Sequence, residues 1–199
     1  MNLQLQNLHG SDISDVLEEL ATLRITVFRE YPYLYDGTTE YEKQYLQSYL
    51  ECPDSIVVLA CDEGRPVGAS TGLPLAAADS DFQRPFENAG NQPVDTWFYC
   101  AESVLLPEYR GQGFGHRFFD EREAHAAKLD GITHTCFCAV ERPPTHPARP
   151  ETYRDLEPFW TARGYQKRED LRTSFPWKEV SETEETVKPL IFWTKEIKR

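Results

Sequence analysis

Basic residues are scarce in this chain of 199 residues, which contains 21 Lys and Arg against 33 Asp and Glu and carries a formal net charge of −12. A nucleic-acid-binding protein gains affinity by neutralising phosphates with Lys and Arg, so this balance argues against a nucleic-acid partner. Acidity is compatible with the attraction of cationic substrates such as amines, but a plain acidic surface explains it equally well. The charge therefore supports an amine substrate only weakly.

Long apolar runs are also missing, since no window approaches the roughly 20 apolar residues that a membrane-spanning helix needs. The stretch from Met1 to Gly10 has neither the basic start nor the apolar run of a signal peptide. Internal repeats and low-complexity tracts are absent from the sequence as well. We therefore expect a protein without membrane association that is located in the cytoplasm.

Cysteine patterns typical of metal sites are absent too. The chain has five cysteines, Cys52, Cys61, Cys100, Cys136 and Cys138, without a C-x-x-C pair or the paired His spacing of a zinc site. Cys136 and Cys138 would share one face of a strand, which is a poor basis for a disulfide framework. We expect reduced, buried thiols and no metal.

What the chain does contain is enough apolar material for a core. Hydrophobic residues make up 40% of it and aromatic residues 13%, which is typical of a folded globular protein. A length of 199 residues suits one domain over 1–199.

Three glycines at alternate positions, Gly111, Gly113 and Gly115, stand between an apolar run that predicts a strand and a pattern that predicts a helix. The first N–H groups of a helix have no partner inside it, and the aligned peptide dipoles place partial positive charge there. Glycine lets a ligand approach the backbone closely, and it adopts left-handed dihedrals at little penalty. With Arg110 at the entrance, this turn is a candidate phosphate site.

Two familiar glycine loops do not fit the spacing. A P-loop needs Lys and then Ser or Thr after its last glycine, but His116 and Arg117 stand there. A Rossmann fingerprint needs two residues between its second and third glycines, and here there is only Phe114. What remains is Arg-x-x-Gly-x-Gly after a Leu-Leu-Pro strand end, or a turn that merely joins a strand to a helix.

This motif and its flanks resemble the acyl-CoA-binding motif of the GNAT superfamily of N-acetyltransferases. The resemblance implies that backbone amides of the turn bind the pyrophosphate of acetyl-CoA and that the preceding strand pairs with the pantetheine arm. It assigns the coenzyme site to Val104, Leu105, Leu106, Arg110, Gly111, Gln112, Gly113, Phe114, Gly115 and His116. For His116 we favour a contact with phosphate or solvent over catalysis, because the helix dipole disfavours its charged form.

The hydrophobic pattern elsewhere predicts the same order of elements as in GNAT proteins: strand, two helices, three strands, helix, strand, helix, two strands. The pattern by itself predicts a mixed α/β fold, and the resemblance implies a mostly antiparallel sheet flanked by helices. The predicted strands are 3–8, 56–61, 67–75, 97–106, 133–140, 171–177 and 190–193. The first predicted helix is capped by Ser11 or Asp12 and ends near Phe28, and the second begins with a capping box at Thr39. The third runs from Phe114 to before Gly131, and the fourth covers 153–163.

Two stretches bear on the acceptor. Tyr31, Tyr33 and Tyr35 lie in an aromatic loop that the resemblance places beside the acceptor, although tyrosines that merely cover the core are an equal alternative. Residues 76–95 are polar, contain Pro85 and lack a period, so they are expected to form a loop, either a lid over the acceptor or a plain insertion.

Glu102 is the candidate that would prepare the amine, since it lies in an apolar strand where several GNAT subfamilies place an acid facing the acceptor. A buried carboxylate there is expected to have a raised pKa, as a general base requires. The alternative is a structural glutamate held by ion pairs or hydrogen bonds.

The resemblance also implies a proton donor for the leaving thiolate. Trp160 stands where the family often has Tyr, and its indole N–H does not titrate. Tyr153 on the same predicted helix is the substitute.

The expected activity is transfer of an acetyl group from acetyl-CoA to an amine, by direct attack in a ternary complex. A small-molecule acceptor is favoured over a protein lysine or N-terminus, and a non-catalytic acyl-CoA-binding protein with the same fold is the alternative from another class. The sequence does not identify the acceptor, and it leaves the oligomeric state open, a homodimer included.

Overall fold

A computed structural model describes residues 3–198 and shows one sheet of eight strands, in the order β1-β2-β3-β4-β6-β8-β7, with β5 paired to β3. The neighbouring strands are antiparallel except β4 and β6, which are parallel. The strands are β1 (Leu3–Leu8), β2 (Ile56–Asp62), β3 (Arg65–Pro74), β4 (Trp97–Tyr99), β5 (Ser103–Leu105), β6 (His134–Val140), β7 (Gln166–Trp177) and β8 (Thr186–Glu196). This mixed, mostly antiparallel sheet confirms the expected fold class.

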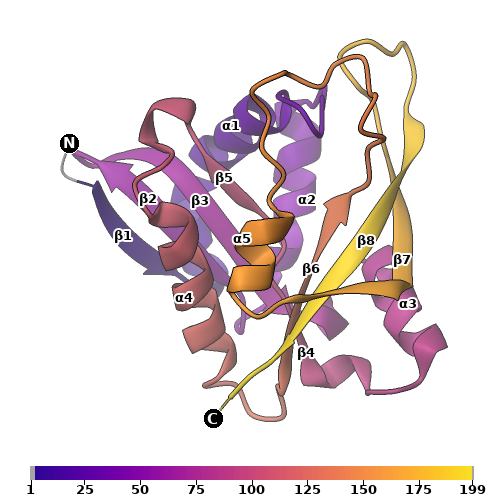
Figure 1. Cartoon of the computed structure of the whole chain (residues 1–199). Helices are drawn as coiled ribbons and strands as arrows, with labels where there is room; N and C mark the ends of the chain where they lie inside the picture. The colour runs from indigo at the N-terminus through magenta and orange to yellow at the C-terminus, as the bar shows by residue number, and fades with distance from the viewer. Residues whose placement is uncertain (1–2, 199) are drawn as a thin grey trace.

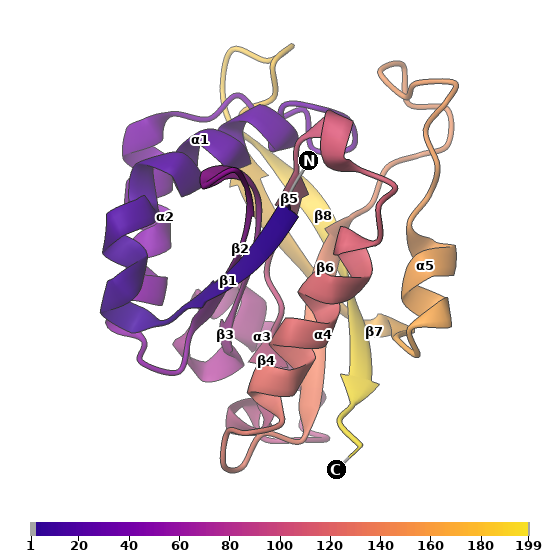
Figure 2. The same ribbon diagram turned by 90° about the vertical axis from the view of Figure 1, so that its left-hand side faces the viewer.

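Helices cover both faces of the sheet (Figures 1 and 2). In Figure 2, α1 (Leu17–Phe28) and α2 (Thr39–Glu51) lie on one side of the sheet, and α4 (Phe114–Ala126) and α5 (Glu157–Ala162) lie on the other. A further helix, α3 (Ser80–Ala89), packs against β7. Short 3₁₀ turns occupy Gly10–Val16, Leu75–Ala77, Val94–Thr96 and Pro107–Tyr109.

Strand β2, next to the edge strand β1, shows why helices cover both faces of the sheet. Successive side chains of a strand point to opposite faces. Val57 and Leu59 join the core cluster beneath α1, α2 and α3, whereas Ile56, Val58 and Ala60 join the cluster beneath α4. An unbroken apolar run therefore marks a strand that is buried on both faces.

Residues 76–95 differ from the expected loop, because they contain α3 and two 3₁₀ turns. Asp79 caps the helix by accepting a hydrogen bond from the Asp81 N–H at 2.8 Å. Phe82 and Phe86 are the buried residues on its inner face. Phe82, Phe86 and Ala89 have the i, i+4, i+7 spacing of a helix, but this short pattern was not recognised in a polar stretch that contains Pro85.

Several predicted boundaries shift by a few residues. Thr38, not Thr39, caps α2, and its hydroxyl accepts from the Tyr41 N–H at 3.3 Å. The first helix starts as a 3₁₀ turn and becomes α-helical only at Leu17. Both closing strands, β7 and β8, are longer than predicted, because the prediction followed their apolar residues and their ends are polar.

No helix within residues 3–198 combines the length and apolar character needed to cross a membrane.

Candidate active site

The expected central strand is interrupted, and the interruption opens the sheet. β4 runs beside β6 as far as the Cys100 N–H, which donates to the Cys136 carbonyl at 2.7 Å, whereas β5 pairs with β3 on the other side. In between, the Ala101 N–H donates to the Thr71 carbonyl and the Thr71 N–H to the Glu102 carbonyl, both at 3.0 Å. Ala101 and Glu102 thus both oppose Thr71, as in a β-bulge. Beyond this bulge, β5 separates from β6.

A buried arginine on α4 holds this bulge in place. Arg122 is 1% exposed and donates from Nη1 to the carbonyls of Thr71 and Glu102, at 3.2 and 3.0 Å. Its Nη2 donates to the Ser103 hydroxyl at 3.0 Å. Arg122 was not predicted as a site residue. Its position four residues after Phe118, on the apolar face of the helix, could have indicated a buried arginine.

The glycine turn follows β5 and has the backbone conformation that the motif predicts at two of its three glycines. Gly111 and Gly113 have φ angles of +76° and +83°, in the left-handed region. A Cβ added to either residue would meet nothing within 4 Å, so the space in front of both is open. Gly115 is different, because it lies inside α4, where an added Cβ would touch the Phe159 ring at 3.6 Å.

The start of α4 supplies donors to this open space. Its first backbone hydrogen bonds run from the N–H groups of His116 and Arg117 to the Gly113 carbonyl, at 3.0 and 3.3 Å. The N–H groups of Phe114 and Gly115 precede these bonds, at the positive end of the helix dipole. A cradle of glycines in front of such donors fits a phosphate group.

Only part of β5 presents its backbone to the opening between β5 and β6. Val104 pairs with Ala69, and the Leu106 N–H donates to a β3 carbonyl at 3.0 Å, so both residues face β3. Main-chain groups of an antiparallel strand alternate in direction, so those of Ser103 and Leu105 face the opening. Of the three strand residues expected to align pantetheine, Leu105 alone turns its main-chain groups toward this opening, and those of Ser103, which was not predicted, face it as well.

Glu102 lies at the bulge with its side chain 9% exposed, and several donors converge on its carboxylate. Arg24 Nη1 is 2.5 Å from Oε1, and the Tyr45 hydroxyl donates to the same oxygen at 2.6 Å. The Thr71 hydroxyl donates to Oε2, and the Tyr49 hydroxyl lies 3.5 Å from that oxygen. The lone pairs of this carboxylate are therefore largely occupied.

The expectation of a raised pKa for Glu102 is wrong. Burial acts to raise the pKa, but the Arg24 charge and the hydrogen bonds from Thr71 and Tyr45 outweigh it, so the pKa lies below its ordinary value. Glu102 is consequently ionised at neutral pH and is a weak base.

Arg24 is held on two sides by carboxylates, which the sequence did not reveal. Its Nε donates to fully buried Glu42, and its Nη1 faces Glu102. The guanidinium also lies over the rings of Tyr45 and Phe28, at 4.3 and 5.2 Å from their centroids. Two carboxylates and one guanidinium leave this buried group with one net negative charge.

An aromatic cavity of about 100 Å³ adjoins this group. It lies where β4 and β6 carry Tyr99 and Cys138. Tyr33 and Tyr35 of the aromatic loop are among its walls, whereas Tyr31 is not. The lining residues are Arg24, Phe28, Tyr33, Tyr35, Tyr41, Tyr45, Phe82, Tyr99, Ala101, Glu102, Cys138, Phe175, Trp177 and Leu190.

Residues 20–156 match the sequence model of the acetyltransferase (GNAT) family. The chain belongs to the GNAT acetyltransferase family. Membership implies acyl transfer from acyl-CoA, in agreement with the phosphate cradle at the glycine turn.

Solved structures support the GNAT fold at low sequence identity. An acetyltransferase from Thermus thermophilus is 16% identical, with a TM-score of 0.56 over 98% of this chain and 97% of that one. A putative phosphinothricin N-acetyltransferase is 13% identical, with a TM-score of 0.62 over 100% of both chains. The putative acetyltransferase yncA from Salmonella typhimurium, solved with its cofactor acetyl-CoA, is 8% identical, with a TM-score of 0.60 over 99% and 95% of the chains. No curated protein matches the sequence.

The side chain of Arg110 in this GNAT chain is engaged next to the turn. Its Nε donates to the Leu105 carbonyl at 2.9 Å, and its Nη1 pairs with Glu30 near the end of α1 at 2.8 Å. Arg110 therefore ties the strand end to α1, and its expected contact with pyrophosphate requires this exposed pair to open.

His116 contacts α5 and the residue after it. Its Nδ1 lies 3.2 Å from Arg163 Nη1, and its ring packs edge-on against Phe159 at 4.8 Å. Gln112 is exposed, and its Nε2 donates to the Glu108 carbonyl at 3.4 Å.

Tyr153 precedes α5 and is not part of it, contrary to the predicted helix. It meets Tyr31 edge-on at 4.6 Å, and Arg149 lies over its ring at 4.7 Å. Tyr31, Tyr33 and Tyr153 line a second cavity of about 210 Å³. Because Tyr33 lines both cavities, it lies between the aromatic pocket and Tyr153.

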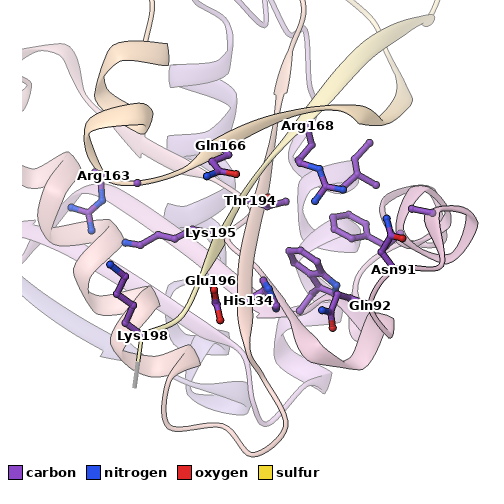
Figure 3. Close-up of a pocket in the computed structure, with 15 residues that line it drawn as sticks. Asn91, Gln92, His134, Arg163, Gln166, Arg168, Thr194, Lys195, Glu196 and Lys198 are labelled. Carbon is purple, nitrogen blue, oxygen red and sulfur yellow. The ribbon is translucent and has the colours of Figure 1, made fainter.

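A larger concavity of about 810 Å³, shown in Figure 3, lies among β7, β8 and the residues after α3. Arg163, Arg168 and Lys195 line it, each at 2.6 to 2.7 Å from a carboxylate oxygen. Most of its positive charge is thus already neutralised, and the glycine turn is not among its lining residues. The open glycine turn therefore fits a phosphate better than this concavity does.

Proposed function

We propose that this protein is an N-acetyltransferase that moves the acetyl group of acetyl-CoA to the amine of a small molecule, by direct attack in a ternary complex. The observation that carries the proposal is the position of β5, which has the aromatic cavity and Glu102 at one end and the glycine turn at the other. A coenzyme arm bound along β5 would bring its thioester to the bulge.

The chemistry needs one bond to form and one to break. The amine nitrogen forms a bond to the thioester carbonyl carbon, the carbon–sulfur bond breaks, the amine releases one proton to water, and the thiolate gains one from a protein donor. The main-chain groups of Ser103 and Leu105 orient the thioester, and the Glu102 charge lies beside the amine. The Tyr153 hydroxyl is our candidate donor to the thiolate; burial raises its pKa, so it is protonated at neutral pH but is a weaker acid than an ordinary tyrosine.

The walls of the cavity favour a small acceptor over a protein. Phe82 of α3 closes it on one side, stacked on Tyr99 at 5.0 Å and on Phe175 at 5.4 Å. Tyr41 of α2 lies on another side. Residues 76–95 thus contribute a wall, whereas an open groove for a peptide would need that side clear.

Release of free CoA thiol from acetyl-CoA, measured across a panel of amines, tests the function. We expect at least one class of small amine to accelerate thiol release. Glu102→Gln is expected to lower kcat/KM by about 10- to 100-fold, because the charge beside the amine is lost, which is less than removal of a full general base. Acetyl-CoA binding without acceleration by any amine would instead indicate a non-catalytic binding protein.

The pH profile separates two roles for Glu102. Because its pKa is lowered, Glu102 does not change charge between pH 6 and 9 and does not retain the amine proton. We therefore expect kcat/KM to rise about tenfold per pH unit toward the pKa of the acceptor amine, since only the neutral amine attacks. A flat profile over this range would mean that Glu102 takes up the proton and acts as the base.

A further inference from the structure

The aromatic cavity has an unusual charge arrangement. Arg24 is the only Lys, Arg or His side chain among the described residues that line it. Both edges of its guanidinium already face carboxylates, Glu42 through Nε and Glu102 through Nη1. A ligand carboxylate would therefore find no free cation here and would meet the repulsion of two buried acids.

The walls of the cavity attract an ammonium group instead. Nine of the fourteen lining residues are aromatic, and the face of an aromatic ring attracts a cation within about 6 Å. The net negative charge of Arg24, Glu42 and Glu102 adds to this attraction. One ammonium group would balance the charge of the site, whereas a second would have no partner.

The size of the cavity limits the part of the acceptor that enters it. Its volume is about 100 Å³. An enclosed apolar cavity of about 150 Å³ holds benzene, so the group that enters this pocket is smaller than a phenyl ring. The apolar side chains Phe82, Phe175 and Leu190 supply its surface.

We infer that the acceptor is a small primary monoamine that carries one short apolar group and no carboxylate. The inference rests on the proposed acetyl transfer and names the substrate class of that site. This substrate class excludes amino acids and polyamines. An amino-acid substrate needs a free cation in the pocket to bind its carboxylate, and a polyamine needs a further anion to bind its second ammonium group.

Matched amine pairs test the inference. Isobutylamine is compared with valine, and isopentylamine with leucine; each amino acid differs from its amine only by a carboxylate. Putrescine tests the effect of a second positive charge, and phenethylamine tests the effect of a larger ring. With acetyl-CoA as donor, we expect kcat/KM for each monoamine to exceed that for its amino acid by about 100-fold or more. Putrescine and phenethylamine are both expected to react more slowly than isopentylamine.

Two variants separate charge from size. Glu42→Gln removes the excess negative charge, so the preference for the amine over its amino acid should fall by about 10-fold or more, whereas exposed Glu40→Gln on the same helix should leave it unchanged. Phe82→Leu enlarges the cavity and is expected to raise kcat/KM for phenethylamine relative to kcat/KM for isopentylamine.

The outcomes distinguish the inference from the proposed function. Faster turnover of valine, leucine or putrescine than of the monoamines would overturn the inference and leave acetyl transfer in place. If no amine or peptide amine accelerates thiol release although acetyl-CoA binds, both the function and the substrate class are wrong.

Discussion

A Gly113→Asp variant is expected to fold as the parent chain does but to bind acetyl-CoA about 100-fold or more weakly. The new carboxylate projects into the open space in front of the α4 N-terminus, because a Cβ at this residue meets no atom within 4 Å. It repels phosphate and competes for the helix N–H groups, and each hydrogen bond lost to a charged group costs about 1.5–3 kcal/mol. Calorimetric titration with acetyl-CoA measures the change.

Gly131→Asp is a matched control for this experiment. Gly131 has a φ angle of +81°, close to the +83° of Gly113, and an added Cβ there also meets nothing within 4 Å. The same charge and the same backbone strain are thus introduced beyond the other end of α4. We expect this variant to keep its affinity for acetyl-CoA, and an equal loss in both variants would contradict a phosphate site at Gly113.

Arg24→Met is expected to lower the free energy of unfolding by about 3–5 kcal/mol, which is typical when one partner of a buried ion pair is removed. Glu42 is 0% exposed and would keep a carboxylate without its cation. Glu102, whose lowered pKa depends on the Arg24 charge, would lose its ion pair at the same time. Urea denaturation at neutral pH measures the change.

The exposed Arg29→Met variant controls for the loss of an arginine at the end of the same helix. Arg29 pairs with Asp36 at 2.8 Å and its side chain is 57% exposed, so its removal should cost less than about 1 kcal/mol. Adding Glu42→Gln and Glu102→Gln to Arg24→Met should restore part of the stability, because neutral groups need no cation. No recovery in the triple variant would mean that Arg24 stabilises the fold by packing alone.

Local sequence determined the conformation of the glycine turn and the outline of the fold. The motif from Arg110 to Gly115 lies within six residues, and glycine dihedrals and a helix start are local properties. Likewise, alternation predicted β1, and the unbroken apolar run predicted β2. Gly164, with a φ angle of +89°, follows α5 as its place in the sequence indicated.

The acceptor site was decided by tertiary structure. Arg24, Glu42 and Glu102 come from α1, α2 and the bulge, 18 and 60 residues apart along the chain, and no local pattern records their contact. The strand 97–106 also reads as continuous, because the bulge depends on pairing with Thr71 and on Arg122. The pKa of Glu102 is lowered, and not raised as expected, because of these contacts between distant residues. Sequence spacing thus determines where a helix can receive phosphate, whereas the charge of a buried pocket depends on which distant side chains the fold brings together.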